Sequence, residues 1–133
     1  MRQQMEREQM RFIILSTLIG VAIGAAAVQT LHAQAKPPVY MVAINEIKDA
    51  DGYRTKYLPT AQKTLKDHGA VYVAAGQGTQ IDGSLPKGRV VILKWDSLDA
   101  LNKWRHSPEY EEIRKVGENF ANYNVVAVDG VAQ

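Results

Sequence analysis

The 133-residue chain contains no cysteine. This absence excludes disulfide bonds, thiolate metal ligands, a cysteine nucleophile and lipid attachment at a cysteine. A small domain without such covalent or metal links must gain its stability from packing or from assembly with another chain.

An excess of one charge is also missing. Sixteen Lys and Arg residues face fourteen Asp and Glu residues, which gives a formal net charge of +2. A nucleic-acid-binding surface needs clustered basic residues, so we predict no nucleic-acid partner. Histidine is scarce as well, and His68 and His106 lie in separate predicted elements. We therefore predict no metal site.

Motifs for nucleophilic catalysis and for cofactor binding are absent. The chain has no Gly-x-Ser-x-Gly turn, and Ser84, Ser97 and Ser107 stand at predicted turns or helix caps. The segment Gly76-Gln77-Gly78 is too short for a phosphate-binding loop. We predict no cofactor, and the sequence leaves open whether the protein is an enzyme.

A long apolar run is present only near the N-terminus. It extends over residues 12–28, follows Arg2, Arg7 and Arg11, and precedes Ala33-Gln34-Ala35. This order is typical of a secretory signal peptide. We predict that residues 1–35 are a signal peptide cleaved near Ala35, so that the protein is periplasmic or secreted and meets the membrane only through this segment. The alternative is an uncleaved anchor, although seventeen residues is short for a membrane span.

Residues 36–133 are predicted to form one α+β domain. Its helices and strands follow the order βαββαβ, which favours a ferredoxin-like fold: a four-stranded antiparallel sheet with both helices on one face. The expected strands are residues 39–47, 70–75, 89–95 and 123–129, and the helical segments lie between about 50 and 67 and between 97 and 120.

Local signals support these helices. Asp49 is an N-cap candidate and Gly69 a C′ candidate for the first helix, while Pro59 either kinks that helix or begins it. In the second half, Asp96 or Ser97 caps a helix, and Ser107-Pro108 begins another. The spacing predicts inward side chains at these positions: Tyr53, Tyr57, Ala61 and Leu65 in the first helix, then Leu98, Leu101 and Trp104, and finally Tyr110, Ile113, Val116 and Phe120.

The strands are apolar on both faces. Residues 71–73, 90–93 and 125–128 show no alternation of apolar and polar side chains. Helices cover only one face of such a sheet, so the other face needs a partner. We predict a homodimer in which two sheets pack face to face, as in a dimeric α+β barrel. The alternative is that valine is frequent because of its strand propensity alone.

Several short motifs occur in an order that resembles the "domain of unknown function 1330" family of the dimeric α+β barrel superfamily. The resemblance covers about residues 39–130 and implies a ferredoxin-like fold without a common established activity. Members usually carry an arginine after the second strand and another two turns after the Ser-Pro-Glu-Tyr element. This chain has no arginine at either place: residues 75–78 follow the second strand, and Gly117 stands at the later position, with Arg114 one turn earlier. An anion-binding role therefore does not transfer to those positions. The motifs are Tyr57, His68-Gly69, Ile81-Asp82-Gly83, Trp95-Asp96-Ser97, Ala100, Trp104, Ser107-Pro108-Glu109-Tyr110 and Val128-Asp129-Gly130.

Aromatic residues give the only indication of a site. They are typical of a core or an interface, but they also suit an aromatic-lined pocket between helices and sheet that holds a small apolar or aromatic ligand. The dipole at a helix C-terminus explains His68 without a function. A solvated strand edge explains Lys87, Arg89 and Lys94 better than an anion site does. The ligand-pocket candidates are Tyr57, His68, Asp82, Trp95, Trp104 and Tyr110.

We therefore expect an exported small-molecule-binding α+β barrel protein. The superfamily also contains cofactor-independent oxygenases, so the resemblance implies cofactor-free enzyme chemistry as one option. The alternative is a non-enzymatic binding or structural module of the cell envelope.

Overall fold

The computed structural model describes residues 36–132, and the predicted signal peptide lies outside them. Residues 37–133 form one compact unit. No helix among the described residues is long and apolar enough to cross a membrane. The elements in chain order are β1 (Val39–Ile47), α2 (Ala50–Gly52), the π-helix η1 (Tyr53–Tyr57), α3 (Leu58–Asp67), β2 (Val71–Gln77), β3 (Arg89–Trp95), α4 (Leu98–Arg105), α5 (Pro108–Gly117) and β4 (Ala121–Asp129).

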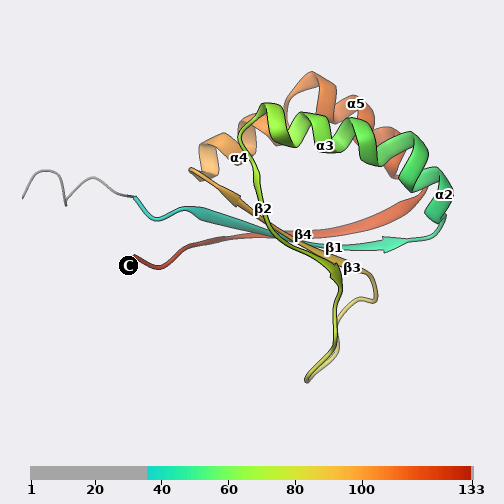
Figure 1. Ribbon diagram of the computed structural model, residues 1–133, viewed down its shortest axis with the longest axis horizontal. Helices are drawn as coiled ribbons and strands as arrows, with labels where there is room; N and C mark the ends of the chain where they lie inside the picture. Colours follow the sequence, from blue (N-terminus) through green and yellow to red (C-terminus); the bar gives the residue numbers. More distant parts are fainter. Residues whose placement is uncertain (1–35, 133) are drawn as a thin grey trace, which may run out of the picture. The chain divides into compact units, whose positions relative to one another are not determined.

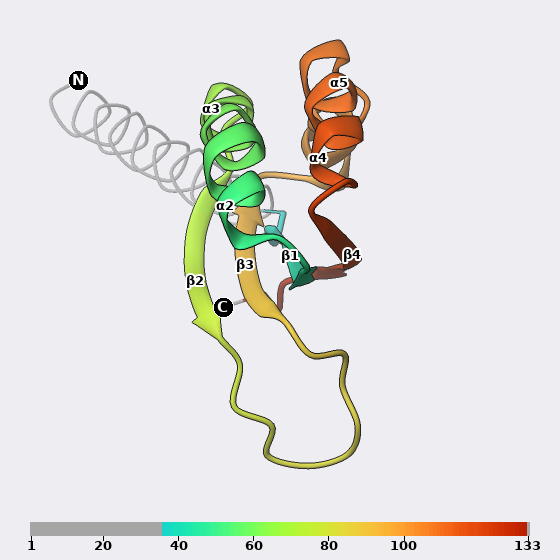
Figure 2. The same ribbon diagram turned by 90° about the vertical axis from the view of Figure 1, so that its right-hand side faces the viewer.

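The four strands form one antiparallel sheet in the order β2-β3-β1-β4. All helices cover the same face of this sheet, with α3 beside the α4–α5 pair (Figures 1 and 2). This arrangement confirms the predicted ferredoxin-like α+β fold. The connection between β2 and β3 extends away from the helices (Figure 1).

The covered face of the sheet carries the core. Along β1, buried Met41 and Ala43 alternate with outward Val42, as strand geometry requires. Leu93 of β3 is directly opposite Met41 and is 0% exposed. The helices contribute Ala61, Leu65, Leu101 and Ile113 to the same core, so a single apolar layer joins sheet and helices.

The first helical segment contains a turn of π-helix. Leu58 N–H donates to the Tyr53 carbonyl, five residues back. Pro59 has no N–H and its ring would clash with the carbonyl of Thr55 in a regular α-helix, which explains the wider turn before it. Helical structure therefore neither starts at Pro59 nor stops there. The wider turn leaves Tyr53 and Tyr57 facing the sheet, with ring centroids 5.0 Å apart.

The predicted caps are present at their expected positions. Ser97 accepts from Ala100 N–H at 3.1 Å, and Ser107 accepts from Tyr110 N–H at 3.4 Å. Gly69 follows α3 with a φ of 84°, a left-handed conformation that glycine adopts without strain. The inward prediction for Leu98 holds only in part: the residue is 49% exposed at the margin of the helix layer, although it lines a cavity between helices and sheet.

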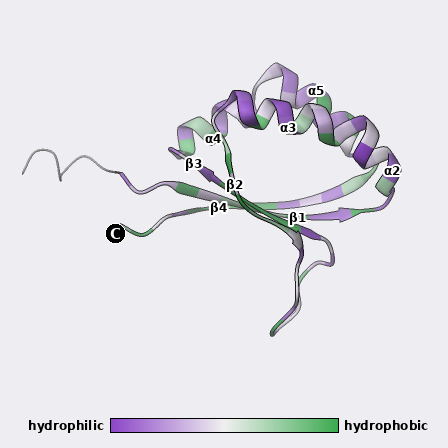
Figure 3. Cartoon of the chain, viewed as in Figure 1, coloured by the Kyte–Doolittle hydropathy of each residue, from purple (hydrophilic) through white to green (hydrophobic). Residues whose placement is uncertain are grey.

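The second face of the sheet is uncovered within residues 36–132. Val42, Ile92 and Val126 lie side by side across three strands on this open face. Val126 is 60% exposed, and hydrophobic residues extend along several strands (Figure 3). A contiguous apolar surface of this kind marks a contact site in soluble proteins.

Candidate functional site

A cavity of about 340 Å³ lies between the covered face of the sheet and the helices. This volume is within the range of small-molecule pockets, roughly 300–1,000 Å³. Its walls are mostly apolar and aromatic, with a few polar groups at defined places. The lining residues include Met41, Ala43, Asn45, Tyr53, Tyr57, Leu58, Ala61, Gln62, Leu65, Tyr72, Arg89, Val91, Leu93, Leu98, Leu101, Asn102, Trp104, Arg105, Tyr110, Arg114, Tyr123, Val125 and Ala127.

Four tyrosines from three segments of the chain meet in the cavity. The Tyr57 and Tyr110 hydroxyl oxygens are 3.5 Å apart, although these residues belong to η1 and α5. Tyr123 of β4 lies against Tyr57 with ring centroids 5.5 Å apart. Asn45 Nδ2 donates to the Tyr53 hydroxyl at 3.3 Å. The cluster places several hydroxyl groups along one wall.

Burial favours the protonated form of three of these phenols, Tyr53, Tyr57 and Tyr123. Desolvation, with weaker effects from neighbouring tyrosines, raises the pKa of Tyr57 far above its ordinary value. Desolvation likewise raises the pKa values of Tyr53 and Tyr123. At physiological pH these hydroxyls are therefore neutral and can donate hydrogen bonds to a ligand.

Tilted aromatic rings extend this cluster from Tyr110 to Trp104 and Trp95. The Trp104 ring lies 3.9 Å from the Tyr110 ring and 5.4 Å from the Trp95 ring. Trp104 Nε1 donates to Thr64 Oγ1 at 3.0 Å, which fixes the indole between α3 and the sheet. A rigid aromatic wall of this type favours flat, apolar ligands.

Two buried polar atoms in the wall, Asn45 Oδ1 and the Tyr123 hydroxyl, have no partner among the described residues. Asn45 is 7% exposed, lines the cavity, and has an unpaired Oδ1. Exchanging the amide oxygen and nitrogen would instead leave the nitrogen unpaired, so either orientation leaves one polar atom for a ligand or a water. Buried polar atoms are rarely left unpaired, which makes this atom a ligand contact candidate.

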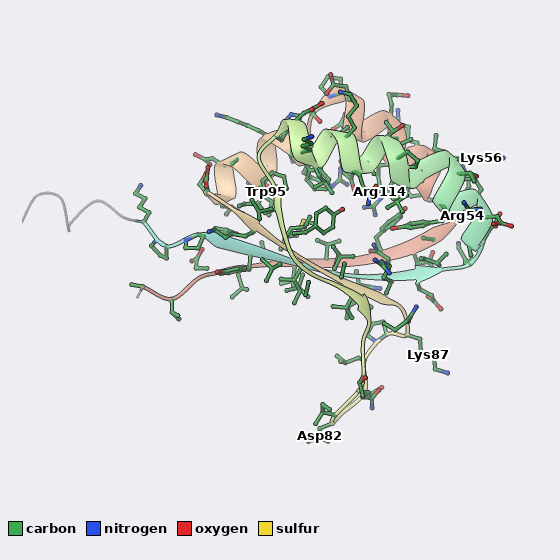
Figure 4. All side chains as sticks on the ribbon, viewed as in Figure 1. Arg54, Lys56, Asp82, Lys87, Trp95 and Arg114 are labelled. Carbon is green, nitrogen blue, oxygen red and sulfur yellow. The ribbon has the colours of Figure 1, made fainter. Side chains whose placement is uncertain are left out.

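Arginine supplies every ionic charge in the cavity wall. Arg89, Arg105 and Arg114 line it, and no lysine, histidine or carboxylate among residues 36–132 does. The Arg114 side chain is 17% exposed and its guanidinium lies 3.9 Å from the centre of the Tyr123 ring. In Figure 4 it projects from α5 between the helices and the sheet. The expectation that Arg89 belongs to a solvated edge is therefore wrong.

Three of the six predicted pocket residues line the cavity: Tyr57, Trp104 and Tyr110. Trp95 is 1% exposed and lies behind Trp104, where its indole nitrogen has no partner among the described residues. His68 ends α3, outside the lining, and its Nδ1 is 2.8 Å from the Thr64 carbonyl. Asp82 lies at the tip of the β2–β3 connection (Figure 4), where it accepts from Gly83 N–H. The structure thus brings the aromatic candidates together and leaves His68 and Asp82 apart.

Metal binding has no support in this part of the chain. Within residues 36–132, no three His, Asp or Glu side chains are grouped so that they could hold a metal ion. The chemistry available in the cavity is hydrogen-bond donation, cationic attraction and aromatic packing.

The fold and this helix–sheet cavity agree with a known protein family. The model of the family described as Domain of unknown function (DUF1330) matches residues 38–131, so the chain belongs to that family. The uncharacterized protein YqjZ of Bacillus subtilis (strain 168) is 28% identical over 86 residues, which cover 63% of this chain and 70% of YqjZ.

Solved structures share the fold at low identity. A protein of unknown function from Rhodopseudomonas palustris superimposes with a TM-score of 0.63 at 15% identity, covering 81% of this chain and 94% of that one. SnoaB, a cofactor-independent oxygenase from Streptomyces nogalater, superimposes with a TM-score of 0.53 at 12% identity, covering 73% of this chain and 96% of SnoaB. At these identities the likeness establishes the fold alone.

Proposed function

We propose that the protein binds a small, flat aromatic or apolar molecule in the helix–sheet cavity. The cavity itself is the observation that carries this proposal: about 340 Å³, walled by the Trp104–Tyr110 stack and the tyrosine cluster. Aromatic side chains that served only to pack the core would fill this space, whereas these side chains surround it. Pockets with mostly apolar walls and few convergent polar groups are the usual sites of small ligands.

Filling the cavity should abolish binding. Ala43 is buried in the cavity wall, so Ala43→Leu places a larger side chain where the ligand would lie. Titration calorimetry with 1-naphthalenemethanol should show saturable binding to the wild type and at least a roughly tenfold weaker affinity for the variant, because about one branched side chain of space is lost.

Ala50→Leu is the matched control, since Ala50 is exposed at the start of α2 and does not line the cavity. It should bind the probe like the wild type. Equal affinities for all three proteins would contradict the proposed location, and an absence of binding to the wild type would contradict the proposed function.

We also propose that the protein is a homodimer that buries the open sheet face. Val42, Ile92 and Val126 form a contiguous apolar surface on that face, and a second copy offers a surface of matching chemistry and shape. A partner sheet would remove this surface from water, which is favourable by roughly 25 cal/mol for each Å² of apolar area.

A charge in the centre of the open face should separate the subunits. Val42 belongs to central strand β1, so Val42→Asp would bury a carboxylate between the two sheets. Light scattering coupled to gel filtration on residues 36–133 should give a dimer for the wild type and a monomer for the variant. Val116→Asp, which places the same substitution on α5 in the helix layer, should remain dimeric. A monomeric wild type would refute the dimer.

Oxygenation without a cofactor is a second candidate activity. It is favoured by the shared fold with SnoaB and by a cavity that can enclose an aromatic ring among hydrogen-bond donors. An oxygen electrode should record uptake when the protein meets an electron-rich phenol such as 1-naphthol, and Trp104→Phe should alter the rate. Uptake equal to that of heat-denatured protein would refute the oxygenase activity, and binding would remain the proposed function.

Export belongs to the same proposal. The apolar run at residues 12–28 between basic residues and Ala33-Gln34-Ala35 supports it. Mass spectrometry of the protein isolated from its own cells should find an N-terminus near Lys36. A mature chain that retains the run would favour the membrane anchor instead.

A further inference from the structure

We infer that the ligand of the cavity carries an anionic group, such as a carboxylate, that is bound by Arg114. This inference rests on the proposed binding function and specifies the chemical class of the ligand. An anionic aromatic molecule would place its ring against Trp104 and Tyr110 and its charge against the arginine.

The charge distribution in the wall supports an anion. Three guanidinium groups line the cavity, and no acidic side chain of residues 36–132 lines it; Glu118, which pairs with Arg114, lies outside the lining. Taking a cation out of water is costly unless an opposite charge or hydrogen bonds compensate it. A bound anion would supply that compensation.

Arg114 is the best positioned of the three. Its Nε donates to Glu118 Oε1 at 3.2 Å, and the Tyr123 ring supports the guanidinium plane at 3.9 Å. The Glu118 side chain is 59% exposed, so water screens the charge that it offers Arg114. An arginine held in this way presents a fixed fork of donors, which matches a carboxylate better than a lysine does.

The other polar groups around the cavity suit an anion as well. The buried tyrosine hydroxyls stay protonated and can donate. Asn45 Nδ2 donates to the Tyr53 hydroxyl, which leaves the Tyr53 O–H free to donate, and Asn45 Oδ1 is an unpaired acceptor. Donors therefore outnumber free acceptors at the polar wall, whereas the wall at Trp104 offers only an aromatic surface.

A pair of probes that differ in charge tests the inference. 1-Naphthoate and 1-naphthalenemethanol have the same ring system, but only the first is anionic at neutral pH. Calorimetry should show that the wild type binds 1-naphthoate roughly tenfold more tightly or better, as expected for a charge-assisted, bidentate contact.

Arg114→Met removes the charge and keeps much of the apolar side chain. It should weaken 1-naphthoate binding about tenfold or more, and by a larger factor than it weakens 1-naphthalenemethanol binding. Arg114→Lys should lose part of the preference for 1-naphthoate over 1-naphthalenemethanol. It provides the test if the methionine variant does not fold. Arg54→Met, which removes an exposed arginine outside the cavity wall, should behave like the wild type.

The outcomes separate two failures. Equal affinity of the wild type for both probes, or an equal loss of both in Arg114→Met, would overturn the inference and leave the binding function standing. Binding of neither probe by the wild type would overturn the proposed function as well. A preference for 1-naphthoate that survives Arg114→Met would overturn the assignment to Arg114.

Discussion

Replacing Trp104 with alanine should lower the free energy of unfolding by about 3–5 kcal/mol, the usual cost of removing a buried large aromatic side chain. Trp104 is 3% exposed and packs between Tyr110 and Trp95. Its removal would enlarge an existing cavity, so the neighbouring rings would lose contacts that no other group can replace.

The indole nitrogen adds a smaller contribution that a second variant isolates. Trp104→Phe retains a ring but loses the hydrogen bond to Thr64, whose own hydroxyl still donates to the Ala61 carbonyl at 2.8 Å. The free energy of unfolding should fall less in this variant than in Trp104→Ala. Its loss reflects the smaller ring and one hydrogen bond of about 1 kcal/mol.

Urea denaturation of the ligand-free protein measures these differences, with equal m-values as the check on the unfolding model. Leu98→Ala is a suitable control because Leu98 is half exposed. It should lower the free energy of unfolding much less than Trp104→Ala does. A loss below about 1 kcal/mol for Trp104→Ala would mean that the rings do not pack as described.

The fold was predictable from short-range chemistry. Ser97 and Ser107 cap helices because their hydroxyls satisfy free N–H groups, and Pro108 suits the first helical turn. The order of helices and strands then identifies a sheet with helices on one face, and the unbroken apolar runs indicate that its other face needs a partner. The π-helical turn was not predictable in the same way, because Pro59 permits a start, a kink or a wider turn.

The aromatic half of the site was predictable, whereas its cationic half was missed. Tyr57, Trp104 and Tyr110 follow the helical period that faces the sheet. A signal for the arginines was nevertheless present: Arg89 has the same strand parity as buried Leu93 and Trp95, and Arg114 follows Tyr110 by four residues. The charge of Arg89 favoured a solvated strand edge, so its position in the cavity wall was not predicted.

His68 and Asp82 show the opposite error. A histidine at a helix end and an aspartate beside a glycine satisfy local backbone groups, and the structure gives both residues such bonds. Sequence order cannot reveal how far the β2–β3 connection lies from the cavity, because that distance depends on the direction in which the hairpin leaves the sheet (Figure 4).

Gly117 is the position where the tyrosine cluster leaves no room for a side chain. A Cβ atom there would lie 2.3 Å from the Tyr123 hydroxyl and 2.5 Å from Tyr57 Cδ2. The helix therefore cannot direct a residue toward the site from this position, and Arg114, one turn earlier, reaches the cavity instead.

Gly117→Ala should accordingly lower the free energy of unfolding by about 1–3 kcal/mol, the cost of overpacking a buried site. This loss should appear even though alanine gains up to about 1 kcal/mol over glycine from helix propensity. Gly76→Ala in β2 is the matched control, because a Cβ there meets nothing within 4 Å. It should change the stability little in the same urea titrations.

The hydroxyl of Tyr123 is the nearest obstacle, so Tyr123→Phe should partly rescue Gly117→Ala. The double variant should be more stable than the sum of the two single changes predicts, because the clash with the hydroxyl contributes to the cost of Gly117→Ala and is absent from the double variant. Strict additivity would show that the added methyl group is accommodated by the Tyr57 ring or by the end of α5. In that case the cluster would be looser than its buried, close-packed hydroxyls and rings indicate, and its tyrosines would orient a ligand less sharply than Arg114 does.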